Sequence, residues 1–300
     1  MKMTSSDLVE NFLGEFATSL EHSLLEVLPD AHGMEEQVIE AMRYGLFAGG
    51  KRLRPFLVMM TSGLFSVEEE NAIRVGAAIE CLHTYSLIHD DLPAMDDDDI
   101  RRGKPSVHKK FDEATAVLAG DALLTLSFEI LADVKTHPDP EIRCELIATL
   151  SRAVGALGMV GGQMIDLKSE NQSLIESEIN RMQQMKTGAL IVFSCEAGAI
   201  LAGVRGERRD VLKHYGRDIG LAFQIADDLL DTERSSLDIG KTAGKDVHAG
   251  KATLVALVGA KDARVKADRL IKQAIESLDI FDDKANILRS LATFVVSRNY

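Results

Sequence analysis

Hydrophobic positions recur at helical spacing along most of this chain. Leu8, Phe12, Phe16 and Leu20 stand four residues apart, and Ser5 or Ser6 is a suitable N-cap before them. Similar stretches, rich in Ala, Leu, Met, Glu and Ile, occupy residues 34–47, 69–92, 111–133, 140–168, 173–202, 207–232, 252–276 and 279–297. There is no sustained two-residue alternation and no Asn-Gly turn between apolar runs. The pattern predicts an all-α fold whose short connections favour antiparallel packing in a bundle.

Two segments interrupt the helical pattern. The first runs from Asp90 to His108 (DDLPAMDDDDIRRGKPSVH), where two prolines and a glycine break the periodicity. The second runs from Ser235 to Lys251 (SSLDIGKTAGKDVHAGK) and contains three glycines and three lysines. Because loops on a rigid helical scaffold often carry function, we expect the chemistry in these two segments.

Composition and charge narrow the class of protein. With 300 residues, six prolines and no low-complexity tract, the chain is predicted to form a single domain over residues 1–300. A net charge of −13 argues against a general nucleic-acid binder.

Cys81, Cys144 and Cys195 lack metal-ligand spacing and fit a reducing compartment. The N-terminus lacks the apolar core of a signal peptide, and no run reaches the roughly 18 apolar residues of a membrane span. We therefore expect a cytoplasmic protein without stable membrane insertion.

The first interruption begins with a cluster of aspartates. Six of the ten residues from Asp90 to Asp99 are aspartates. Such closely spaced carboxylates repel one another and raise their own pKa values, so bound cations would help them to stay ionised. A solvated surface is the ordinary explanation of an acidic run. This run, however, directly follows an apolar helical stretch, CLHTYSLIH, so its first residues should project from packed structure.

A second aspartate cluster lies in FQIADDLLD. Asp227 and Asp231 are four residues apart and share a helix face, with Asp228 beside them on an otherwise apolar helix. A salt bridge with Arg217 or Arg234 is the structural alternative. Oxygen ligands of this kind select hard cations such as Mg²⁺. Two carboxylate sets facing across a cleft would hold a diphosphate through bridging metal ions.

Basic residues accompany both acidic clusters. They comprise Arg101 and Arg102 after the first cluster, Lys241, Lys245 and Lys251 after the second, the segment GGKRLRP at residues 49–55, and Lys186 beside Thr187. Arginine offers a planar fork to a phosphate, and lysine offers a compact charge. GGKRLRP lacks the GxxxxGK[ST] spacing and the preceding strand of a Walker loop. Any one of these cations alone is typical of a solvated surface, but their recurrence in an acidic chain indicates metal-bridged anions.

The ordered motifs carry a family resemblance. GGKRLRP, HDDLPAMDDDDIRRGKPSVH, GDALL, GGQMIDL, KTGAL, FQIADDLLD and GKTAGKD stand in the order and spacing of the trans-type polyprenyl diphosphate synthases. From about residue 35 onward the chain resembles this family, and within it the bacterial farnesyl diphosphate synthases. The resemblance implies the isoprenoid synthase fold, a single bundle of roughly ten or more mostly antiparallel helices around a central cleft. It also implies a homodimer.

The resemblance assigns a metal role to both aspartate clusters. It implies a first metal-binding motif from Asp90 and Asp96, with Asp91 supporting, and a second from Asp227, Asp228 and Asp231. In the family, three Mg²⁺ ions bind the allylic diphosphate between these motifs.

The substrate-binding residues are implied in the same way. Positions that grip the allylic diphosphate match Arg101, Lys186 and Lys241, with Lys251 as a further match. Positions of the isopentenyl diphosphate pocket match Gly50, Lys51, Arg54, His83 and Arg102. Thr187 and Gln224 match positions beside the reacting carbons.

The implied chemistry is ionisation, condensation and elimination. Mg²⁺ and cationic side chains stabilise the leaving diphosphate, and the oxygens of Thr187 and Gln224 stabilise the allylic cation. The double bond of isopentenyl diphosphate attacks that cation, and the released diphosphate removes the proton without a side-chain general base. The catalytic set is thus expected to be Asp90, Lys186, Thr187, Gln224 and Asp227. Closure of the segment 235–251 should exclude water.

Product length is expected to depend on the helix that leads to Asp90. Tyr85 and Ser86 stand about one turn before Asp90, where a growing chain would extend. An aromatic residue five positions before the first aspartate resembles the bacterial farnesyl synthases, so a fifteen-carbon product is predicted. The alternatives are a geranylgeranyl diphosphate synthase of the same family, and a Tyr85 that packs in the core or at a dimer interface and sets no length.

The sequence departs from the family at two places and leaves rival classes open. Leu254-Val255 replaces a pair that is usually Tyr-Pro, and Lys245 stands where a small or uncharged residue is common, so neither is assigned a role. An HD-type metal phosphohydrolase could use His83 and His89-Asp90, but the other histidines form no matching motif. An acidic Ca²⁺-binding scaffold is a second alternative class, but the sequence contains no EF-hand loop. An inactive regulatory subunit and a terpene cyclase remain as further alternatives.

Overall fold

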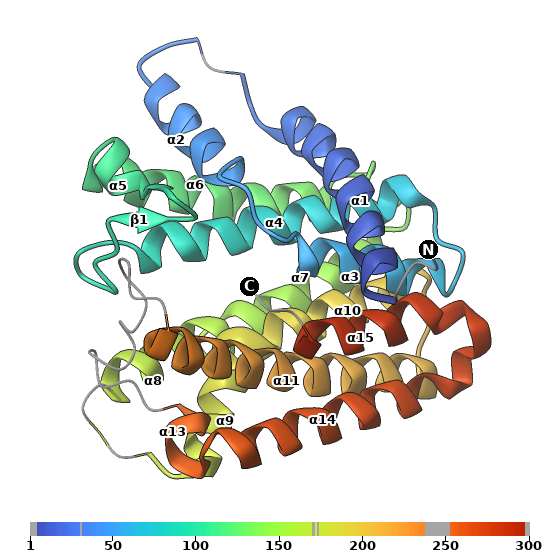
Figure 1. The fold of residues 1–300 in the computed structure, drawn as a ribbon. Coiled ribbons are helices and arrows are strands. Elements are labelled where there is room, and N and C mark those ends of the chain that lie inside the picture. The colour runs from blue at the N-terminus through green and yellow to red at the C-terminus, as the bar shows by residue number, and fades with distance from the viewer. Residues whose placement is uncertain (1–4, 31, 170–171, 173, 238–252, 298–300) are drawn as a thin grey trace. The chain divides into compact units, whose positions relative to one another are not determined.

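The computed structural model of the chain describes residues 5–30, 32–169, 172, 174–237 and 253–297. The described residues are mostly helical, and their contacts divide the chain into two compact units (Figure 1). One unit comprises Glu10–Ile147, and the other comprises Met1–Val9 together with Ala148–Tyr300. The all-α fold predicted from the hydrophobic spacing is confirmed, whereas the single domain over residues 1–300 stays a prediction.

The unit Glu10–Ile147 is built around helix α4. It contains α1 (Ser5–Val27) from Glu10 onward, α2 (Glu36–Leu46), α3 (Leu53–Gly63), α4 (Glu69–Asp90), strands β1 (Ile100–Arg101) and β2 (Lys104–Pro105), α5 (Val107–Lys110), α6 (Glu113–Ala132) and the first part of α7 (Pro140–Val154). Residues 75–82 of α4 are buried without a break, and α4 packs along both α6 and α3 (Figure 1). Because neighbouring helices cover this middle stretch, the C-terminal end of α4 is held on a rigid support.

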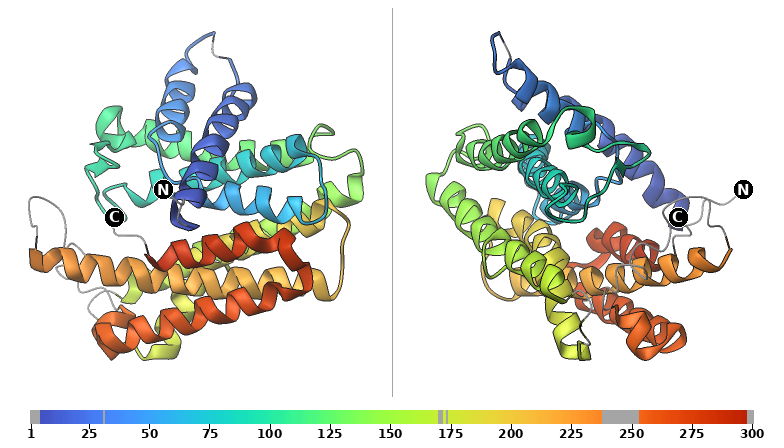
Figure 2. Two further views of the ribbon diagram at one scale, coloured as in Figure 1. Left: turned by 45° about the vertical axis from the view of Figure 1, so that its right-hand side comes forward. Right: turned by 90° about the vertical axis from the view of Figure 1, so that its left-hand side faces the viewer.

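The second unit is a helical bundle in which α10 and α11 are central. It contains the rest of α7, α8 (Met159–Ser169), α9 (Glu176–Gln183), the π-helical turn η1 (Gln184–Gly188), α10 (Ala189–Leu201), α11 (Glu207–Leu237), α13 (Leu254–Val258), α14 (Ala260–Ser277), the 3₁₀ segment η2 (Leu278–Ala285) and α15 (Asn286–Ser297). Helix α11 packs against both α10 and α14 (Figures 1 and 2). The buried hydroxyl of Tyr215 on α11 donates to the Leu288 carbonyl at 2.7 Å, which ties α11 to α15.

The structure departs from the predicted helices at several places. The stretch 252–276 is divided into α13 and α14 at Gly259, whose φ is 84°. The stretch 140–168 is divided into α7 and α8, because the chain turns at Gly155, whose carbonyl accepts from the N–H of Gly158 at 2.9 Å. Helix α3 lies outside the predicted helical stretches, and it holds Pro55 in its first turn. Proline is tolerated in the first turn of a helix, where its missing N–H leaves no hydrogen bond unmade.

Two helical stretches of the described chain, Glu113–Ala132 and Pro140–Ser169, are long and apolar enough to span a membrane by length and composition. Half of the apolar window in the first stretch is buried inside the protein, and core helices of globular proteins pass the same test. The second stretch is divided between α7 and α8. Neither stretch is a clear membrane span.

Candidate active site

The acidic segment, residues 90–99, is folded back against the end of α4. The backbone N–H of Asp96 donates to the Asp90 carbonyl at 2.9 Å, and that of Asp98 donates to the Asp91 carbonyl at 3.2 Å. A hairpin formed by β1 and β2 follows, and its two-residue strands are too short to leave an alternating pattern in the sequence. The backbone bonds gather the aspartates into a compact group, in which Asp90 and Asp96 are half-buried.

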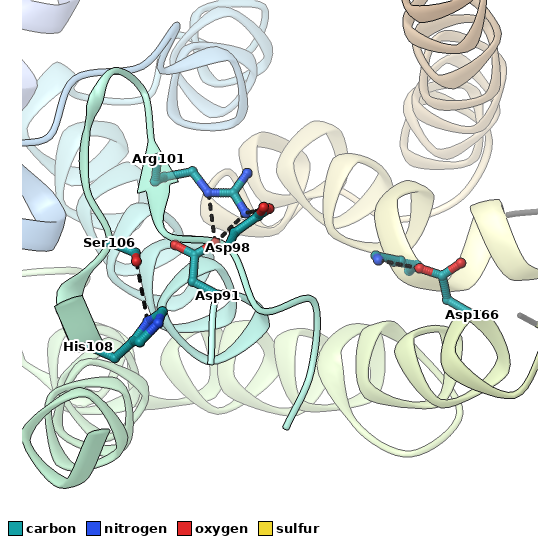
Figure 3. A network of polar contacts seen from close by, with 7 residues as sticks. Asp91, Asp98, Arg101, Ser106, His108 and Asp166 are labelled. Atoms are coloured by element: carbon teal, nitrogen blue, oxygen red, sulfur yellow. Dashed lines mark hydrogen bonds and ion pairs between the residues drawn. The ribbon is translucent and has the colours of Figure 1, made fainter. Parts of the chain in front are cut away.

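Asp91 differs from its neighbours because it is buried and paired with an arginine. Its side chain accepts a hydrogen bond from Arg101 Nε at 3.0 Å and a second from Arg101 Nη2, and the same guanidinium lies 3.5 Å from Asp98 (Figure 3). Burial raises the pKa of Asp91, and the hydrogen bonds from Arg101 oppose that rise. Two predicted residues, a supporting metal ligand and a diphosphate-binding arginine, are therefore brought together as a pair.

A further donor set in this unit consists of Asp97, Asp99 and His108. Their ligand atoms lie within 4.8 Å of one another. His108 is buried, and its Nδ1 lies 3.3 Å from the hydroxyl of Ser106 (Figure 3). Mixed imidazole and carboxylate ligands suit transition metals, whereas oxygen ligands alone suit Mg²⁺. The carboxylates of Asp90 and Asp96 thus match Mg²⁺ better than this mixed set does.

The basic segment, residues 49–54, passes through left-handed backbone before α3 begins. Gly49 and Gly50 have φ angles of 93° and 127°, which favour glycine. Arg102 donates from Nη1 to the Gly49 carbonyl, and its guanidinium occupies the space that a side chain at Gly50 would need. This packing explains why a glycine stands at position 50, and it places Arg102 against the basic segment.

Arg54 and His83 form a contact within the same unit. Arg54 Nη1 lies 3.3 Å from His83 Nε2, which joins the first turn of α3 to α4. Burial, reinforced by the charges of Arg54 and Arg102, holds the pKa of His83 well below its ordinary value, so the imidazole is neutral at pH 7. The residues matched to the isopentenyl diphosphate pocket are thus gathered here, with Lys51 exposed on the same segment.

In the second unit, Lys186 lies on the π-helical turn η1 and contacts a buried carboxylate. Its Nζ donates to Asp166 of α8 at 2.6 Å (Figure 3), and the side chains of Lys186 and Thr187 are both partly exposed. Gly162 of α8 allows this approach, because a Cβ there would overlap the backbone of Lys186. Single π-helical turns are rare and are frequent at functional sites.

The α11 aspartate face consists of Gln224, Asp227, Asp228 and Asp231, which stand at positions i, i+3, i+4 and i+7 of one helix. Gln183 of α9 donates from Nε2 to the Asp228 carboxylate at 3.2 Å, and η1 packs against α11. The α11 aspartate face therefore lies beside the turn that carries Lys186 and Thr187. Lys241, Lys245, Lys251 and the side chain of Arg234 lie outside the described residues.

Tyr85 is half-buried on α4 and packs on the imidazole of His89. The two rings meet edge to face with centroids 5.1 Å apart, and His89 Nε2 lies 3.0 Å from the Val117 carbonyl of α6. Burial, followed by the charges of Asp90 and Asp121, raises the pKa of Tyr85. The hydroxyl of Ser86 donates to the His83 carbonyl of its own helix. Of the two predicted length-determining residues, Tyr85 therefore presents a packed aromatic ring, and Ser86 presents a small side chain bonded to its own helix.

Sequence reasoning missed two residues of the second unit that contact predicted site residues. Asp166 contacts Lys186, and Gln183 contacts Asp228. Gly162 stands four residues before Asp166 in GGQMIDL and admits the close approach of α8 to η1. The acid of this motif could not be given a partner from the sequence, because Lys186 lies on another element.

Gly162→Ala is expected to reduce condensation activity strongly and to lower the free energy of unfolding by about 1–3 kcal/mol, the usual range for overpacking. The added methyl would push α8 away from η1 and displace Lys186. Activity assays and urea unfolding measure the two effects. Gly63→Ala is a suitable control, because a Cβ there meets no neighbouring atom. Equal effects of the two substitutions would contradict the packing argument.

Comparisons with known proteins cover nearly the whole chain. The family model described as polyprenyl synthetase matches residues 35–291. Farnesyl diphosphate synthase of Escherichia coli K12 is 46% identical over 270 residues, which cover 87% of this chain and 89% of that relative. Farnesyl diphosphate synthase of Bacillus subtilis 168 is 41% identical over 291 residues, covering 97% and 98%.

A solved structure shares the fold. The apo crystal structure of an FPP/GFPP synthase from Zymomonas mobilis is 48% identical and superposes with a TM-score of 0.88, covering 97% of this chain and 100% of that one. With the family model, the curated relatives and this structure in agreement, the chain belongs to the polyprenyl synthetase family.

Proposed function

We propose that this protein is a trans-prenyltransferase that condenses isopentenyl diphosphate with dimethylallyl diphosphate and then with geranyl diphosphate, giving (2E,6E)-farnesyl diphosphate and diphosphate. The observation that carries this proposal is the α11 aspartate face beside the π-helical turn of Lys186 and Thr187. Metal-binding carboxylates next to a lysine and neutral oxygens are what an ionising allylic diphosphate requires. The identity to farnesyl diphosphate synthases supports the same reaction.

We propose that Mg²⁺ is bound by the carboxylates of Asp90 and Asp96, supported by Asp91, and by those of Asp227, Asp228 and Asp231. These donors fit the ion, because they are carboxylate oxygens and because Asp90, Asp96, Asp227 and Asp228 are half-buried rather than fully solvated. When bound, Mg²⁺ neutralises charge on the departing diphosphate. The resemblance gives three such ions per site.

The protein's own side chains bind the two substrates and stabilise the charges that develop in the reaction. Lys186 and Arg101 hold the allylic diphosphate and stabilise its charge as it leaves, together with Lys241 and Lys251. The oxygens of Thr187 and Gln224 lie beside the allylic carbon and stabilise its positive charge. The basic segment with His83 and Arg102 binds isopentenyl diphosphate, and the neutral imidazole donates a hydrogen bond without adding charge. The departing diphosphate accepts the proton that the condensation releases.

We further propose a homodimer in the cytoplasm. In the unit Glu10–Ile147, α6 exposes Val117 and Leu118, whose side chains are 40% and 54% accessible. These two neighbouring apolar residues offer apolar surface on α6 that a second copy would cover. Size-exclusion chromatography with light scattering tests the oligomeric state.

The rival HD-type phosphohydrolase requires His83 and His89-Asp90 to share a metal. In the described part of the chain, His83 lies against Arg54, and His89 contacts the Val117 carbonyl and Tyr85. An arginine in contact with a metal-ligating imidazole would repel the metal. These contacts favour the prenyltransferase.

The test is incubation of the purified protein with isopentenyl diphosphate and either dimethylallyl or geranyl diphosphate, with Mg²⁺ or with EDTA, followed by mass spectrometry. A fifteen-carbon diphosphate that disappears in EDTA is the expected result. A twenty-carbon product would favour the alternative geranylgeranyl diphosphate synthase. Absence of condensation by folded protein with any allylic primer would overturn the proposal, and release of phosphate from a monoester would favour the phosphohydrolase.

A further inference from the structure

One arginine of the basic segment points into the protein rather than toward a substrate. Arg52 stands between Lys51, which is exposed, and Leu53, the first residue of α3, but the Arg52 side chain is only 1% exposed. Its backbone is left-handed, with φ 50° and ψ 30°. This conformation is unfavourable for a residue with a side chain, so it persists only where surrounding contacts fix it.

The guanidinium of Arg52 connects helices of the unit Glu10–Ile147, and its Nη2 also lies 4.0 Å from the half-exposed carboxylate of Glu21 on α1. Its Nη1 forms an ion pair with Glu80 in the middle of α4, and Glu80 is only 3% exposed. Its Nη2 donates to the Leu46 carbonyl at 2.6 Å. Leu46 is the last residue of α2, where carbonyls lack partners within the helix. The end of α2, the start of α3 and the middle of α4 are thus fixed by one side chain.

The same stretch of α4 holds the next arginine of the segment. Glu80 and His83 are three residues apart and share a face of α4. Glu80 pairs with Arg52, and His83 lies 3.3 Å from Arg54. The two contacts form one register between the basic segment and α4, so the position of Arg54 depends on the ion pair beside it.

Glu80 also offsets the positive charge that gathers around the basic segment. Burial lowers the pKa of His83, and the charges of Arg54, Arg102, Arg52 and Arg101 lower it further. The charge of Glu80 opposes the lowering of the Arg102 pKa by burial. Without a buried carboxylate, these guanidiniums would repel one another and separate.

We infer that Glu80 is a positioning residue for the homoallylic diphosphate, acting through its buried ion pair with Arg52 on the basic segment, an inference that rests on the proposed function. Glu80 does not touch the substrate, because its side chain is buried against Arg52. It fixes the backbone that carries Lys51 and Arg54, and it holds them opposite His83. The residue therefore governs the affinity for isopentenyl diphosphate rather than the ionisation of the allylic partner.

The first test is Glu80→Gln, which keeps the shape of the side chain and removes its charge. We expect the KM for isopentenyl diphosphate to rise about tenfold, while the KM for geranyl diphosphate stays within about twofold. Initial rates with one substrate saturating and the other varied give both constants. Calorimetric titration with isopentenyl diphosphate alone should show the same loss of affinity without any reaction.

A second set of variants separates positioning from stability. In the double variant Arg52→Met and Glu80→Leu, an apolar pair replaces the buried ion pair, which commonly preserves or restores stability. We expect this variant to unfold at a urea concentration near that of the wild type but to keep the raised KM. Arg74→Gln is the matched control. Arg74 lies on the same helix, but its partner, at a distance of 2.8 Å, is Asp133 and not a residue of the basic segment. The control should lose stability with an unchanged KM.

The outcomes distinguish the inference from the proposed function. A wild-type protein that does not condense the two diphosphates overturns the proposed function, and the inference with it. A wild type that condenses them, with a KM and a calorimetric affinity unchanged in Glu80→Gln, overturns the inference alone. Recovery of the wild-type KM in the double variant would also overturn it, since the pair would then be purely structural. If Glu80→Gln does not fold, Glu80→Asp is measured in its place.

Discussion

Lys186→Gln is expected to lower kcat for the condensation by about 10²–10³-fold, the usual effect of removing one group that stabilises charge in a transition state. The ammonium of Lys186 is fixed by the buried Asp166 at 2.6 Å and by the π-helical turn that carries it. A glutamine has the reach to hydrogen-bond but no charge to offset that of the leaving diphosphate. Single-turnover rates with geranyl diphosphate measure the chemical step directly.

Two further variants make the Lys186 result specific. Asp166→Asn retains the lysine but weakens its anchor, so a smaller fall in kcat is expected. Lys168→Gln is the matched control, because Lys168 is exposed on the same helix as Asp166 and should leave the rate unchanged. If Lys186→Gln stays within about threefold of the wild type, the lysine does not stabilise the leaving group.

Local spacing was sufficient to predict how the aspartates of α11 lie. Residues four apart share a helix face wherever that helix packs, so the common face of Asp227 and Asp231, with Asp228 beside them, follows from spacing alone. The same holds for the position of Tyr85 and Ser86 on the helix before Asp90. The helical class of the fold was predicted for the same reason, because its periodicity is local. Gln224, by contrast, was assigned from the family resemblance.

Tertiary contacts could not be predicted in this way. Nothing in GGKRLRP distinguishes the buried Arg52 from the exposed Lys51, because the difference depends on Glu80, 28 residues later. Likewise, Asp90 and Asp91 are identical in sequence terms, but only Asp91 is buried against Arg101. Asp166 was missed because its partner Lys186 is 20 residues away on another element. The resemblance to a family named residues that bind, but not the residues that support them.

Tyr85→Ala is expected to lengthen the main product from fifteen to twenty or more carbons. Tyr85 is half-buried about one turn before Asp90, and its ring is held edge to face against His89. Removing the ring would open space below the metal-binding end of α4, and a growing chain stops where it meets a bulky side chain. Mass spectrometry of the products at several substrate ratios measures the shift.

Tyr44→Ala is the matched control for the loss of a ring. Tyr44 on α2 also packs edge to face on an aromatic ring, that of Phe111, and its hydroxyl donates to the Pro105 carbonyl at 2.7 Å. Its removal should lower stability without changing product length.

Tyr85→Phe tests whether bulk alone sets the length. This variant keeps the ring and loses only the hydroxyl, so a steric limit predicts that the fifteen-carbon product is retained. An unchanged product in Tyr85→Ala would remove Tyr85 from the length assignment. A longer product in both variants would instead mean that the hydroxyl, and not the volume of the ring, limits the chain.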